Sequence, residues 1–80
     1  MTTMRAKVKL NTIQPNQGSE TLIFNPVAKN GAYGEHGKDE DNTYAKYSPS
    51  GQFVLTVANP ALLGQFKVGE TYYVDFMPAE

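Results

Sequence analysis

The clearest pattern in the chain is a strict alternation of apolar and polar residues near its start. The apolar positions are Met4, Ala6, Val8 and Leu10, and the positions between them are Arg5, Lys7 and Lys9. A period of two places these two sets on opposite faces of a β-strand. The pattern therefore predicts a strand with one apolar face and one basic face. We expect it to end at Gln14–Gly18, where proline and glycine favour a turn.

Four further segments are rich in β-branched and aromatic residues and are bounded by glycine or proline. They are Glu20–Phe24, Thr43–Tyr47, Gln52–Ala58 and Thr71–Met77. We expect each to be a strand, with the turn residues Ser48–Gly51 joining the third and fourth strands as a hairpin. Asn59–Gly64 has a capping residue, a proline at the first helical position and a closing glycine, which predict one helical turn.

These elements predict an all-β fold, a small five-stranded antiparallel barrel that spans residues 1–80 as one domain. An SH3-like barrel is the first choice, because the short helical turn falls before the last strand. An OB-like barrel is second, because its helix more often lies between the third and fourth strands. A chain of this length buries only about 60–65% of its unfolded surface, so we expect a small core.

The composition of the chain excludes several kinds of functional site. The chain has no cysteine, which excludes disulfides, thiolate metal sites and cysteine nucleophiles. Its formal net charge of −1 gives no overall attraction to nucleic acid. No stretch has the apolar segment of a signal peptide or the roughly 20 apolar residues of a membrane helix. We therefore expect a cytoplasmic protein with no membrane association.

The segment Gly31–Asn42 gathers glycines, the only histidine and a cluster of acidic residues. We predict an exposed loop, and loops of this length in a small domain are usually functional or disordered. Its bulky and charged members form the predicted binding surface for a protein partner: Tyr33, Glu35, His36, Asp39, Glu40 and Asp41. The alternative is a solvated acidic loop that only aids solubility.

Metal, phosphate and catalytic roles of this loop fit the sequence poorly. The acidic residues do not follow the alternate spacing of a calcium loop. Gly31, Gly34 and Gly37 recur every third residue, unlike a dinucleotide or phosphate-binding motif. His36 has no recognisable nucleophile or orienting carboxylate. We expect no enzymatic activity, no metal and no cofactor.

A second function class is single-stranded nucleic-acid binding by the basic strand face. Such surfaces combine cations that follow the phosphates with aromatic rings that stack on bases. The residues available for this alternative are Arg5, Lys7, Lys9, Lys46, Tyr44, Tyr47 and Tyr73. The same lysines could instead keep a strand from pairing with other chains, and the same tyrosines could belong to the core.

Three segments also invite comparison with known proteins: Lys38–Gly51, Val57–Leu62 and Gly69–Glu80. Together they resemble small proteins encoded by tailed bacteriophages and prophages. The resemblance implies the cytoplasm of an infected bacterial host, and a role in the virion or in binding a host or phage protein. It carries no catalytic or ligand motif, so no functional residue follows from it. The sequence leaves the oligomeric state open, including pairing of the first or last strand across a two-fold axis.

Overall fold

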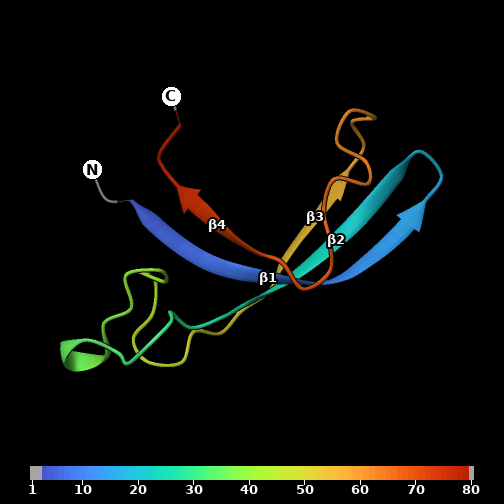
Figure 1. The fold of residues 1–80 in the computed structure, drawn as a ribbon. Helices are drawn as coiled ribbons and strands as arrows, with labels where there is room; N and C mark the ends of the chain where they lie inside the picture. The colour runs from blue at the N-terminus through green and yellow to red at the C-terminus, as the bar shows by residue number, and fades with distance from the viewer. Residues whose placement is uncertain (1–2, 80) are drawn as a thin grey trace.

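One antiparallel sheet organises the chain in this computed structural model, which describes residues 3–79. Its strands are β1 (Met4–Asn16), β2 (Ser19–Pro26), β3 (Phe53–Val57) and β4 (Thr71–Phe76), in the spatial order β3-β2-β1-β4 (Figure 1). A short 3₁₀ turn, η1 (Glu35–Gly37), is the only helical element within these residues. The predicted all-β class is confirmed.

The sheet curls into a half-barrel whose two edge strands, β3 and β4, do not pair with each other (Figure 1). The radius of gyration is 14.4 Å, against about 12 Å for a compact domain of this length. The sheet has four strands, not the predicted five, because Thr43–Tyr47 forms turns instead of a strand. The SH3-like and OB-like assignments are not confirmed and stay predictions.

β1 is longer than predicted and has different neighbours along its length. Its first half pairs with β4, from Met4 opposite Phe76 to Lys9 opposite Thr71. Its second half pairs only with β2, through a tight turn at Gly18, which has φ +77°. Pro15 lies in this second half and does not end the strand, since proline is tolerated where one side of a strand has no neighbour.

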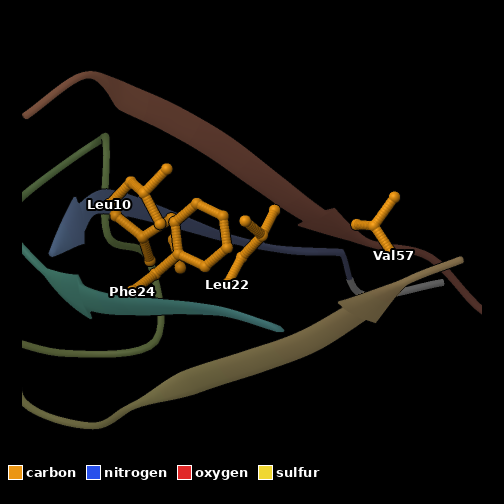
Figure 2. Packing of buried hydrophobic residues seen from close by; sticks show 6 residues of the cluster. Leu10, Leu22, Phe24 and Val57 are labelled. Carbon is orange, nitrogen blue, oxygen red and sulfur yellow. The ribbon is translucent and has the colours of Figure 1, made fainter. Parts of the chain in front are cut away.

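The core covers the inner face of the half-barrel. Leu10, Leu22 and Phe24 cluster there, with Val57 at the end of β3 (Figure 2). Ala6 and Val8 complete the buried set. The ring of Phe24 meets those of Phe53 and Tyr72 at centroid distances of 5.6 and 5.8 Å. The predicted alternation of β1 is therefore confirmed, because its apolar row faces the core.

The connection between β3 and β4 closes one side of this core. Leu63 and Phe66 pack against the buried cluster. Asn59 begins the connection by accepting the backbone N–H of Ala61 on its side chain, at 3.0 Å. The expected helical turn at Asn59–Gly64 is wrong in detail, because these residues form hydrogen-bonded turns without a helix.

Candidate functional site

The long connection between β2 and β3, residues 27–52, folds back against the first half of β1. Val27 donates its backbone N–H to Lys7 O at 2.9 Å, and Thr43 donates its own to Arg5 O at 2.9 Å. The Thr43 hydroxyl also accepts the backbone N–H of Arg5 at 2.8 Å. These groups occupy the side of β1 that β2 leaves unpaired, so the loop is fixed to the sheet.

Asn42 and Asp39 form a buried anchor inside this loop, with only 0% and 4% of their surfaces exposed. The Asn42 side chain accepts the backbone N–H of Lys7 at 2.8 Å and donates to Val27 O at 2.8 Å. It also donates to Asp39 Oδ2 at 3.1 Å. One amide group thus joins β1, the end of β2 and the loop.

All of the hydrogen bonds to Asp39 come from its own loop. Its Oδ2 accepts the backbone N–H of Lys29 at 3.0 Å, and its Oδ1 accepts those of Asp41 and Asn42 at 2.9 and 3.2 Å. Burial alone would raise the pKa of this carboxyl, but these hydrogen bonds to the charged form outweigh it and lower the pKa. The expectation that Asp39 lies in an exposed loop is therefore wrong: its carboxylate holds the loop together.

The other two acidic residues of the cluster face cations. Glu40 is exposed and meets Lys29 Nζ at 2.8 Å, which lowers the pKa of Glu40 and raises that of Lys29. Asp41 lies 3.5 Å from Lys7 Nζ and accepts the hydroxyl of Tyr73 at 3.0 Å. Of the two, only Glu40 stands free enough of the sheet to meet a partner.

The outer face of β1 carries a network that pairs Arg5 and Lys7 with carboxylates. Arg5 binds Asp75 through two hydrogen bonds, of 2.6 and 3.1 Å, and its guanidinium lies 4.6 Å from the centre of the Tyr73 ring. The hydrogen bond from Arg5 lowers the pKa of Asp75. The hydrogen bond to Asp41 raises the pKa of the Tyr73 hydroxyl. Tyr73, Asp41 and Lys7 thus extend the ion pair across the face.

This network bears on the residues considered for nucleic-acid binding. Arg5 and Lys7 already face carboxylates, and of the three tyrosines only Tyr73 lies beside them. Tyr44 packs against the core instead, and Tyr47 belongs to the long loop. Lys9 and Lys46 are exposed and have no ion pair among residues 3–79. The structure does not bring the seven residues into one surface.

The far part of the long loop, around η1, extends away from the sheet (Figure 1). There the Tyr47 ring lies directly over Gly37, so close that a Cβ on Gly37 would be 2.5 Å from it. Tyr47 also donates its backbone N–H to Gly37 O at 2.9 Å, and its ring meets Tyr33 edge to face at 5.8 Å. Two distant parts of the loop are clamped together at this point.

Two residues of this region have unusual backbone conformations. His36 and Tyr47 have φ of 59° and 58°, in the left-handed region that non-glycine residues seldom adopt. The side chains of Glu35 and His36 are 83% and 76% exposed and approach each other to 3.3 Å. We call Tyr33, Glu35, His36 and Tyr47 the loop tip. Glu35, His36 and Tyr47 are exposed and Tyr33 is half-buried, and the backbone at His36 and Tyr47 is in a costly conformation.

A small apolar cleft of about 170 Å³ opens on the inner face, at the end of the half-barrel near Met4. Phe53, Val74 and Phe76 line it, together with Tyr44. Burial raises the pKa of the Tyr44 hydroxyl, which has no hydrogen-bond partner among the described residues. The cleft is large enough for one apolar side chain.

Of the predicted partner-binding residues, Glu35 and His36 are exposed at the loop tip, and Tyr33 is half-buried against Tyr47. Sequence reasoning missed the contribution of Tyr47, which depends on a contact with Gly37 ten residues away. It also missed the anchor. The Asp-x-x-Asn spacing from Asp39 to Asn42 was a usable signal, since such side chains often bind backbone N–H groups two or three residues on.

Within residues 3–79, no group of three or more histidine or acidic side chains is arranged to hold a metal ion. The same residues contain no helix with the length and apolar character needed to cross a membrane. No family model, curated protein sequence or solved structure matches the chain. The residues themselves, and their positions, therefore carry the functional proposal.

Proposed function

We propose that this chain is a non-enzymatic interaction protein that binds a host or phage protein through its loop tip. The observation that carries the proposal is the clamp of Tyr47 over Gly37, which fixes the backbone next to the exposed side chains of Glu35 and His36 and packs Tyr47 against the half-buried Tyr33. A loop needed only to connect β2 to β3 would have no use for two strained non-glycine residues. Such conformations are concentrated where binding requires a fixed surface.

The chemistry of the loop tip suits a protein partner. Tyrosine is enriched in protein interfaces, because its ring offers a large apolar area and its hydroxyl a hydrogen bond. Glu35 and His36 add one exposed carboxylate and one exposed imidazole to the same loop. Because the anchor fixes the base of the loop, less conformational entropy is lost on binding than with a free loop.

The setting of this interaction is part of the proposal. The resemblance of Lys38–Gly51 and Gly69–Glu80 to phage-encoded proteins supports a partner in the cytoplasm of an infected bacterium, either a host protein or a component of the virion. Single-stranded nucleic-acid binding is the second candidate. The pairing of Arg5 with Asp75 and of Lys7 with Asp41 weighs against it.

The test compares binding by variants that leave the fold unchanged. The double variant Glu35→Ser, His36→Gly removes both exposed side chains, and glycine suits the positive φ of position 36. The matched control is Gln17→Ser, in the exposed turn at the far end of the β1–β2 hairpin. Each protein is immobilised and exposed to an extract of infected cells, and the partner is then purified and titrated.

We expect the tip variant to lose at least tenfold in affinity for the purified partner, about 1.4 kcal/mol, and the control to bind as the native chain does. Equal affinity of all three proteins would rule out the loop tip. A partner that is a single-stranded oligonucleotide, bound in a salt-dependent manner, would instead establish the second candidate.

A further inference from the structure

The outer edge of β4 is a row of unpaired backbone groups. Leu10 donates its backbone N–H to Glu70 O, so the backbone groups of the even-numbered residues from Met4 to Leu10 point toward β4. The backbone N–H and C=O groups of their partners Val74 and Phe76 point toward β1 in return. The N–H and C=O groups of Tyr73 and Asp75 therefore point away from the sheet, and within residues 3–79 no segment pairs with them.

This edge lacks the devices by which proteins usually prevent strands from pairing. Such devices are prolines, lysines and bulges, and very short strands. Thr71–Phe76 contains neither proline nor lysine and pairs with β1 without a shift of register. Its one charged residue, Asp75, is already neutralised by Arg5. β3, the other edge, is one residue shorter than β4.

We propose that a second copy of this chain pairs with β4, antiparallel, across a two-fold axis at Val74. In that register Val74 opposes Val74 and Tyr72 opposes Phe76 on the inner face. On the outer face Tyr73 opposes Asp75, and these two residues exchange the free backbone hydrogen bonds. Phe76, which is 45% exposed in the single chain, becomes covered. This interface is separate from the loop tip and independent of the function proposed for it.

In this register the side chains of β4 complement those of an identical strand. This self-complementarity favours a second copy of the chain over an unrelated peptide. Only apolar side chains meet on the inner face when the axis lies at Val74. A shift that moves the axis to Tyr73 would place Phe76 opposite Glu70, which leaves a carboxylate against an aromatic ring. The small core gives a reason for pairing, because within residues 3–79 it has only six buried hydrophobic residues and small domains often gain stability by association.

The experiment combines solution mass with amide exchange on the full chain. Sedimentation is measured over a wide concentration range, and hydrogen exchange is followed at the outward amides of β4, Tyr73 and Asp75. The outward amides of β3, Val54 and Thr56, serve as the internal control. We expect a dimer, and protection that rises with concentration at the β4 amides alone.

Substitutions at the two edges give an independent readout. Phe76→Lys places a charge in the proposed interface and should weaken the dimer roughly tenfold, because the pair with Tyr72 occurs twice. Leu55→Lys on β3 is the control, since Leu55 has a similar exposure, 48%. A chain that stays monomeric, or polymers weakened equally by both substitutions, would overturn the proposal. Amides of Tyr73 and Asp75 that exchange at the same rate at all concentrations would overturn it without use of any variant.

Discussion

The side chain of Asn42 takes the place of a strand neighbour for Lys7, whose backbone N–H it accepts at 2.8 Å. β2 has ended at this level of the sheet, so a backbone donor inside the protein would otherwise lack a partner. The sheet is thus completed by an amide side chain and not by a strand. This relationship makes the long loop a structural part of the fold as well as a candidate binding surface.

Replacement of Asn42 should therefore cost far more than replacement of an ordinary loop residue. Asn42→Ala removes the bonds to Lys7, Val27 and Asp39 and leaves buried polar groups unpaired, for an expected loss of roughly 2–4 kcal/mol in the free energy of unfolding. Urea unfolding at neutral pH measures this loss. Asn30→Ala, at an exposed position of the same loop, is the control and should stay within about 0.5 kcal/mol of the native chain. Similar midpoints for the two variants would show that the anchor is not needed.

The anchor should also make stability sensitive to acid. Because the pKa of Asp39 is lower in the folded protein than in the unfolded chain, its ionised form stabilises the fold at pH values above the unfolded pKa of about 3.9. This contribution is lost as the pH falls through the folded pKa. Asp39→Asn places an amide N–H₂ or a weaker acceptor against the Lys29 and Asn42 donors and should cost roughly 2 kcal/mol at pH 7.

The measurement is the difference in unfolding free energy between the native chain and Asp39→Asn from pH 7 to pH 3. We expect this difference to be constant between pH 7 and 5 and to shrink at acid pH. Glu40→Gln is the control, because Glu40 is exposed and its pair with Lys29 is screened by solvent. A difference that stays constant down to pH 3 would contradict the role given to the Asp39 carboxylate.

Substitution of two glycines in the long loop should distinguish the cost of backbone strain from the cost of a side-chain clash. Gly31 and Gly37 have φ of +85° and +76°, but a Cβ on Gly31 meets nothing within 4 Å. Gly31→Ala should cost about 1 kcal/mol, the penalty of a positive φ. Gly37→Ala should cost roughly 2–3 kcal/mol, because overpacking against the Tyr47 ring is added. Thermal unfolding gives the stabilities, and ring chemical shifts of Tyr33 and Tyr47 should change only in Gly37→Ala. Equal costs would mean that the clamp does not constrain the loop tip.

The pairing of Arg5 and Lys7 with carboxylates gives a prediction for nucleic-acid binding. We expect the native chain to show no binding to a short single-stranded oligonucleotide at physiological salt, as followed by fluorescence anisotropy. Asp41→Asn combined with Asp75→Asn releases Lys7 and Arg5 from their carboxylates and should create weak binding that decreases steeply with added salt. Tight binding by the native chain would show instead that Lys9 and Lys46 suffice.

The positions of the four strands followed from the sequence, since each is encoded by local patterns. The alternation of β1 and the turn at Gly18 depend only on neighbouring residues. Thr43–Tyr47 has similar strand propensity but lies elsewhere in the fold. Ala45 donates its backbone N–H to Asn42 O at 3.1 Å, which forms a turn, and Tyr47 has φ of 58°. The contacts of Thr43 with Arg5, remote in sequence, override the local preference.

The candidate site, like the fold, could be predicted only where neighbouring residues determine it. Exposure of Glu35 and His36 follows from a polar, glycine-rich loop. The burial of Asp39 does not, because its charge suggests solvent and only the fold brings Lys29 and Asn42 to its oxygens. Likewise, a row of basic residues can be read from the sequence, but the acidic partners Asp41 and Asp75 come from distant segments.

The pairing of β1 with β4, which lie far apart in the sequence, sets the order in which this protein can fold. The β1–β2 hairpin closes through a two-residue turn, and local pairings of this kind form early. Met4 finds its partner only at Phe76, far along the sequence. Until then the apolar row of β1, which includes Ala6 and Val8, stays open on the β4 side. During translation the nascent chain is therefore vulnerable to aggregation until β4 has been made and can pair with β1.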